Sequence, residues 1–390
     1  MAPELGDPCR LFAEAAEPLD TITVVLSESV DFSDSPVPSN ESEQLLFPNQ
    51  FETLVRLDCM GQLRAGLATA WTADETGRVW TFLLPDARLT DGSLENAPRV
   101  LSSWRVRETA VREQGIDSVA VQDGNRLVVT LNQRADSAPR LFADPALAVS
   151  RGPFSPMPGS DMLVVQSDGP PPALIHFRLE PNSDPRDALD RGADLVVTRD
   201  PALVDYVARR PEFVALPLPW SRTYVLLQPP SGKPLDMVTG EADRRSLARD
   251  AVSGNARAAE PPFWWNEEAA CPAGGTPGST TKSSRVVYIH GDEVAQGLAE
   301  RIVALAGAGT RLRVAALNPA ELASALQSGS ERAYVIAVPR RTLARCREIA
   351  GWPLSASIVP LIDTRAHAIV RKGAPPLAVD WDGTVRVLQP

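Results

Sequence analysis

The stretch from residue 51 to residue 92 places several local signals in a fixed order, and this order constrains the fold more than any other part of the chain. A Gly66-Leu67-Ala68 segment is followed by a polar turn at Asp74–Gly77. The next residues, Val79–Leu83, alternate in polarity as a half-buried strand does. An Asp91-Gly92 turn then closes the block. We therefore expect a small sheet whose strands are joined by tight turns.

A helix is predicted immediately before this block. Asn40 is placed to cap its first turn, with Glu43 three residues on, and the helix is expected to reach about Leu54 with a kink at Pro48. Within the block we expect Trp71 and Trp80 to be core residues.

The order of these signals resembles the N-terminal signature of family 5 extracellular solute-binding proteins, which deliver peptides, nickel complexes and similar solutes to ABC importers. The family pattern is a helix ending in "tLv", a short turn, "pgLA..W", "dG..wtF.L" and "DG". Further similarities are Trp104 on a predicted helix at residues 96–113 and a hairpin turn at residues 123–125. The resemblance covers roughly residues 21–388 and is most specific in the first hundred residues.

The resemblance implies an α/β chain with a two-lobed periplasmic-binding-protein-like fold (type II, large cluster), in which mixed sheets are flanked by helices and a hinge joins the lobes. We expect a first lobe at residues 1–230, with a signature subdomain at about 45–150. A second lobe is expected at 231–357, and residues 358–390 should return to the first lobe. Independently, the alternation of strands and helices over residues 285–327 predicts parallel pairing.

Charge and motif content exclude several classes of function. The net charge of −10 argues against nucleic acid or an anionic membrane as a partner. The histidines, His176, His290 and His367, lack the spacing of metal ligands, and no nucleophile or phosphate-loop motif occurs. Asp380–Gly383 is interpreted as a β-turn rather than a calcium loop. We expect no enzyme activity, no cofactor and no metal.

The function implied by the resemblance is capture of a small-molecule or peptide solute in an inter-lobe cleft for the membrane subunits of an ABC importer. Such a protein would be a periplasmic or extracellular monomer, with lipid anchoring before processing as one option. The polar N-terminus is then interpreted as that of a mature form with an added initiator Met, and a cytosolic protein is the rival interpretation. The alternative function is a degenerate receptor-like scaffold or sensory module without a transport role.

Four cysteines, at positions 9, 59, 271 and 346, allow three pairings. An exported location favours disulfides. We expect Cys271–Cys346 within one lobe and, second, Cys9–Cys59; four separate buried thiols are the alternative.

Candidate ligand-binding residues follow from the position of the cleft in the family. They are Trp220, Arg222, Tyr224, Trp264, Trp265, Ser39 and Asn40. Trp supplies contact area with a polar N–H, and Arg222 could bind a carboxylate through two hydrogen bonds. The alternative, purely structural roles are core packing for the tryptophans, a surface ion pair for Arg222 and a helix cap for Asn40. Peptide receptors carry an acidic residue in a "w..dypdp" stretch before the last strands, and its absence here argues against a peptide ligand.

Overall fold

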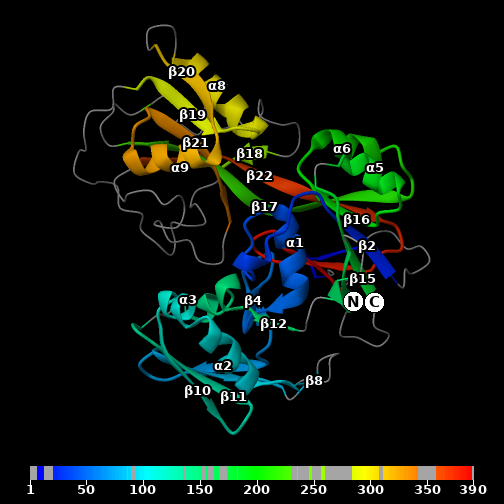
Figure 1. The fold of residues 1–390 in the computed structure, drawn as a ribbon, viewed down its shortest axis with the longest axis vertical. Helices are drawn as coiled ribbons and strands as arrows, with labels where there is room; N and C mark the ends of the chain where they lie inside the picture. The colour runs from blue at the N-terminus through cyan, green and yellow to red at the C-terminus, as the bar shows by residue number, and fades with distance from the viewer. Residues whose placement is uncertain are drawn as a thin grey trace, which may run out of the picture. The chain divides into compact units, whose positions relative to one another are not determined.

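A computed structural model describes residues 7–12, 21–85, 87–88, 94–134, 138–151, 155–156, 162–166, 174–181, 183–229, 235, 246–247, 256–259, 283–306, 311–340 and 357–388. The chain divides into two compact units (Figure 1). Unit 1 consists of Met1–Pro219 and His367–Pro390, and unit 2 consists of Trp220–Ala366. The α/β character predicted from the sequence is confirmed. None of the described helices is long and apolar enough to cross a membrane.

The main sheet of unit 1 is mixed. Its strands in spatial order are β13 (Ser155–Pro156), β14 (Met162–Gln166), β15 (Leu174–Leu179), β2 (Thr21–Leu26) and β16 (Leu195–Thr198), followed by the last residues of β22 (Ser357–Arg371). β2 runs parallel to both β15 and β16, and β22 pairs antiparallel with β16. Helices α5 (Pro185–Asp190) and α6 (Pro201–Val207) bury Leu189 and Leu203 against Val25 and Val196 of this sheet.

The signature block forms a second sheet in unit 1, with the order β10-β11-β7-β6. These strands are β6 (Ala70–Ala73), β7 (Val79–Leu83), β10 (Ile116–Gln122) and β11 (Arg126–Leu131). The hairpin turn between β10 and β11 is confirmed, since Gln122 pairs with Arg126 across a three-residue loop in which Asp123 and Gly124 adopt positive φ. Trp80 is buried as predicted, but Trp71 is only half-buried because it lies on the edge strand β6.

Two helix boundaries differ from the prediction. The first helix, α1 (Glu41–Gln50), ends at Gln50 rather than near Leu54, because Phe51–Glu52 forms β3 and pairs with β12 (Val149–Ser150). The helix expected over 96–113 is divided into α2 (Ala97–Val106) and α3 (Glu108–Glu113) at Arg107. Trp104 on α2 is fully buried, and its indole N–H donates to the carbonyl oxygen of Leu147 at 2.9 Å.

Short elements complete unit 1. They are β1 (Arg10–Leu11), η1 (Phe32–Asp34), β4 (Val55–Leu57), β5 (Leu63–Ala65), β8 (Ala87–Arg88), β9 (Leu94–Glu95), α4 (Ala138–Leu141), η2 (Pro145–Leu147), β23 (Leu377–Val379) and β24 (Val385–Val387). The order β1-β23-β24 brings the N-terminal segment against the C-terminal tail. Asp380–Gly383 is the predicted turn between β23 and β24, with the Gly383 N–H donating to the Asp380 carbonyl at 3.0 Å.

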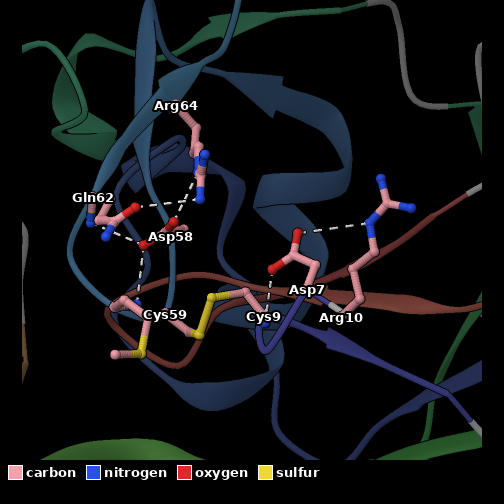
Figure 2. The surroundings of a disulfide bond; sticks show 8 residues. Asp7, Cys9, Arg10, Asp58, Cys59, Gln62 and Arg64 are labelled. Carbon is pink, nitrogen blue, oxygen red and sulfur yellow. Dashed lines mark hydrogen bonds and ion pairs between the residues drawn. A yellow bond between two sulfur atoms is a disulfide. The ribbon is translucent and has the colours of Figure 1, made fainter. Parts of the chain in front are cut away.

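The predicted disulfide Cys9–Cys59 is present, with the Cα atoms 5.3 Å apart, and links the segment of β1 to the turn between β4 and β5 (Figure 2). Asp58, next to Cys59, accepts hydrogen bonds from the backbone N–H of Gln62 at 2.8 Å and from Arg64 Nε at 2.8 Å. The bridge therefore joins two segments that hydrogen bonds already order locally. Cys271 and Cys346 lie outside the described residues, so the pairing expected for them stays a prediction.

Unit 2 contains a sheet whose described strands follow the order β17-β21-β19-β20. They are β17 (Phe213–Gln228), β19 (Arg285–Ile289), β20 (Arg313–Leu317) and β21 (Ala333–Pro339), and β17 begins in unit 1. The parallel pairing predicted for residues 285–327 is confirmed by β19 and β20. Helices α8 (Glu293–Ala306) and α9 (Pro319–Ser328) pack on different core clusters of this sheet (Figure 1).

Candidate ligand-binding site

The part of β17 that lies in unit 2 carries three of the predicted ligand-binding residues, Trp220, Arg222 and Tyr224. This segment is held by antiparallel pairing with β21, in which Arg222 stands opposite Pro339. Immediately after β21, the backbone N–H of Arg340 donates to the carbonyl oxygen of Ser221 at 2.7 Å. The backbone that presents these three side chains is therefore fixed by strand pairing.

Trp220 lies beneath two arginine side chains. The guanidinium carbon of Arg257 is 4.8 Å from the centroid of the indole ring, and that of Arg365 is 4.6 Å from it. Both distances are within the range in which a cation is attracted to the face of an aromatic ring. All three side chains are half-buried. The predicted aromatic residue is thus part of a cationic cluster that the sequence did not indicate.

Asp363 is the acidic member of this cluster and is 5% exposed. Its Oδ1 accepts a hydrogen bond from the Thr223 hydroxyl at 2.7 Å, and its Oδ2 accepts one from Arg257 Nε at 3.2 Å. The second contact follows from strand register, because β18 (Ala256–Ala258) lies beside β22 (Figure 1) and places Arg257 directly opposite Asp363. Arg365 lies two residues further along the same strand, on the same face.

The electrostatics of the cluster reflect burial and crowding of like charges. Burial raises the pKa of the Asp363 carboxyl above its usual value, and the Thr223 hydrogen bond and the charges of Arg257 and Arg340 oppose that rise. Burial lowers the pKa of Arg365, and repulsion by Arg257 lowers it further. The guanidinium groups of Arg257 and Arg340 thus act on the carboxylate of Asp363, and that of Arg365 lies over the same indole as Arg257. Planar guanidinium groups held in this way suit carboxylate recognition.

Arg222 and Tyr224 belong to a neighbouring group in unit 2. The Tyr224 hydroxyl is hydrogen-bonded to Asp292 Oδ1 at 3.1 Å, and the same oxygen accepts the Ala295 N–H at the start of α8 at 2.9 Å. Burial and the charge of Asp292 raise the pKa of Tyr224, while the charge and hydrogen bonding of Arg222 oppose the rise. Tyr224 therefore stays a neutral phenol at physiological pH.

The two candidate residues in unit 1 make local hydrogen bonds. Asn40 caps α1 as predicted, since its side-chain oxygen accepts the Glu43 N–H at 2.9 Å. Its side-chain N–H donates to the Ser29 carbonyl at 2.9 Å, and the Ser39 hydroxyl donates to Glu43 at 2.7 Å. These bonds give both residues a structural role, and their contact with a ligand stays a prediction.

The remaining candidates, Trp264 and Trp265, lie outside the described residues. Within the described part of the chain no group of three or more His, Cys, Asp or Glu side chains is placed to hold a metal ion.

Sequence reasoning missed Arg257, Asp363 and Arg365. A signal for the last two was available, because they interrupt an otherwise largely apolar strand, SIVPLIDTRAHAIVR, with charges two residues apart. Charges in a buried strand need partners or a function. Arg257 lies on the three-residue strand β18, which is too short for its sequence to show a pattern.

Comparisons of sequence find no relative of this chain. No protein-family model matches it. No curated protein matches it either.

Comparisons of structure, in contrast, find many similar chains. One is a periplasmic binding protein, AgaA, from Agrobacterium tumefaciens R10 in complex with agropinic acid, with a TM-score of 0.65 at 14% identity over 95% of this chain and 99% of that chain. A second is the ABC transporter substrate-binding protein CtaP from Listeria monocytogenes, with a TM-score of 0.72 at 12% identity over 91% and 94%. A third is NikZ from Campylobacter jejuni in complex with Ni(L-His), with a TM-score of 0.64 at 14% identity over 91% and 94%. The resemblance to family 5 solute-binding proteins therefore extends to the fold, which is that of two-lobed periplasmic binding proteins.

Proposed function

We propose that this chain is an exported solute-binding protein that captures a small solute and presents it to the membrane subunits of an ABC importer. The observation that carries the proposal is the similarity of fold to binding proteins over nine-tenths or more of both chains. Fold alone does not fix function. The sequence signature of residues 51–92 supports the same conclusion independently of the structural comparison.

Two features of the chain support the details of this function. The Cys9–Cys59 disulfide suits an oxidising compartment, such as the periplasm or the exterior of the cell. The β17 segment supplies an indole, a guanidinium and a phenol at Trp220, Arg222 and Tyr224, which are groups that orient small ligands in binding proteins. We assign these three residues, together with Trp264 and Trp265, to ligand binding, and expect the receptor to act as a monomer without catalysis.

Native mass spectrometry of the protein, purified without denaturation from an export compartment, tests the proposal. A solute-binding protein should retain one small molecule per chain, and isothermal titration calorimetry with that molecule should give a stoichiometry of one. If nothing co-purifies, a panel of peptides, opines and nickel chelates is titrated directly. A chain that retains nothing and binds no member of the panel at millimolar concentration contradicts transport and favours the scaffold alternative.

A further inference from the structure

The cationic cluster around Trp220 supports a more specific conclusion about the ligand, which rests on the proposed function. We propose that Arg257 and Arg365, positioned by Trp220, form a binding site for the carboxylate group of the solute. This assigns the ligand to carboxylate-bearing small molecules and adds Arg257 and Arg365 to the residues that bind it.

The two cations of the cluster are held in place by their neighbours. Two guanidinium carbons lie 4.8 Å and 4.6 Å from one indole centroid, and Arg257 is also tied to Asp363 at 3.2 Å. The indole and the carboxylate therefore fix the positions of cations that would otherwise be mobile on long side chains. A pre-positioned guanidinium binds a carboxylate with less loss of side-chain entropy than a mobile one.

The cluster differs electrostatically from the chain as a whole. The whole chain has a net charge of −10, so its overall field repels anions. Around Trp220 two guanidinium groups lie over one indole, and the charge of Arg257 disfavours that of Arg365. A bound carboxylate would reduce this repulsion between the arginines. The cluster thus selects a negative group, in a protein whose remaining surface discourages nonspecific anion binding.

The cations of the cluster are accessible while its acidic group is not. Arg257, Arg365 and Trp220 are half-buried, whereas Asp363 and Thr223 are buried. The Thr223 hydroxyl donates to Asp363 at 2.7 Å, and Asp363 in turn accepts from Arg257. The cations remain partly in contact with solvent, as binding of a dissolved ligand requires. A partly desolvated cation also binds an anion more strongly than a fully hydrated one does.

The experiment is calorimetry at pH 7 with the full chain and its disulfide intact. The probes are mannopinic acid, citrate, succinate, the neutral diamide of succinate and inorganic phosphate. Arg365→Gln is the test variant, because it removes a cation over Trp220 and leaves the ion pair between Arg257 and Asp363 in place. Arg210→Gln is the matched control, because Arg210 also lies over an aromatic ring, 4.9 Å from the Tyr206 centroid, and pairs with Asp190. Circular dichroism establishes that both variants are folded.

The proposal expects at least one carboxylate probe to bind with a stoichiometry of one. Arg365→Gln should weaken that binding about tenfold or more, as loss of a hydrogen bond between charged groups does, and Arg210→Gln should leave it unchanged. Equal affinity of Arg365→Gln and the wild type overturns the proposal, and so does binding of phosphate alone or of neutral solutes alone. If no probe binds, a co-purified solute is used as the probe instead. A co-purified solute without a carboxylate contradicts the carboxylate assignment alone and leaves the proposed transport function supported, whereas a co-purified carboxylate should bind Arg365→Gln about tenfold more weakly than the wild type.

Discussion

Two arginines on the same strand, Arg365 and Arg371 of β22, are held in different ways. Arg371, in unit 1, stacks 4.7 Å from the Phe213 centroid and pairs with Asp194 Oδ1 at 2.7 Å. The second oxygen of Asp194 accepts the Thr23 N–H at 2.8 Å, so one cation and one carboxylate close a structural link between strands. Arg365, in unit 2, shares its aromatic ring with a second cation, Arg257.

The difference shows how the same contact types serve structure in one place and recognition in another. An arginine matched by its own carboxylate and ring adds stability and has little capacity left for a ligand. Arg257 and Arg365, which lie over one ring, repel each other, and an added anion relieves that repulsion. The crowding of two cations over one ring, rather than the presence of an arginine over a ring, distinguishes the two sites.

The largest expected effect is on the free energy of unfolding of unit 1, the unit that contains Arg371. Replacing both cysteines of the bridge, Cys9→Ser with Cys59→Ser, opens a loop of sequence separation 50. The free energy of unfolding should fall by about 4 kcal/mol, mainly through the entropy of the unfolded chain. Urea titration followed by circular dichroism measures this, with reduced wild type as a second comparison. Carboxylate binding in unit 2 of the double variant should be unchanged at low urea. An unfolding midpoint equal to that of the wild type would contradict the structural role of the disulfide.

The second prediction compares how much the two arginines contribute to the free energy of unfolding. Arg371→Gln should lower the free energy of unfolding by about 2 kcal/mol, because it leaves the largely buried Asp194 without its charged partner. Arg365→Gln should change it by less than about 1 kcal/mol, because removal of one cation also relieves repulsion by Arg257. Urea titrations of the two variants give both values. Equal losses would show that Arg365 is a structural residue like Arg371.

The third prediction is a pH dependence of binding. Because the pKa of Asp363 is raised in the folded protein, its carboxyl takes up a proton at higher pH than in the unfolded chain. Protonation removes a negative charge from beside Arg257 and Arg340, so affinity for a carboxylate probe should rise, by up to about fivefold, as the pH falls toward the raised pKa of Asp363. The raised pKa of Asp363 also stabilises the folded state at low pH. This stabilisation is lost as the pH rises through the pKa of Asp363 in the folded protein.

Calorimetry with citrate and succinate at pH 7, 6 and 5 checks this dependence, after correction for the ionisation of each probe. Asp363→Asn is the control, since it removes the titrating group and should abolish the trend. A trend that persists in Asp363→Asn would assign the pH dependence to another group.

The smallest expected effect is that of the aromatic ring. Trp220→Leu should weaken carboxylate binding about twofold to threefold, because the cation–π contacts that position Arg257 and Arg365 are lost. Phe213→Leu removes the corresponding ring beside Arg371 and should leave binding unchanged. Competition calorimetry resolves differences of this size. Equal effects of the two substitutions would remove the distinction between the two rings.

The sequence by itself determined most elements of the fold and the resemblance to solute-binding proteins. Strand alternation, the Asn40 cap and the turn at Asp123-Gly124 depend on residues close together in the chain, so local physical rules predict them. The helix boundary at Gln50 was not predictable in this way. Phe51–Glu52 leaves the helix in order to pair with Val149–Ser150, about a hundred residues away in the chain.

Only the tertiary structure decided the composition of the candidate site. Trp220 was identified from its position in the chain, but its partners Arg257 and Arg365 come from two other strands, and strand register alone sets Arg257 opposite Asp363. Register depends on long-range pairing, and a shift by one residue would turn every side chain of the strand to the other face. The sequence therefore supplied the charges and the rings, while the pairing of distant strands decided which cations share an aromatic ring and which of them pairs with Asp363.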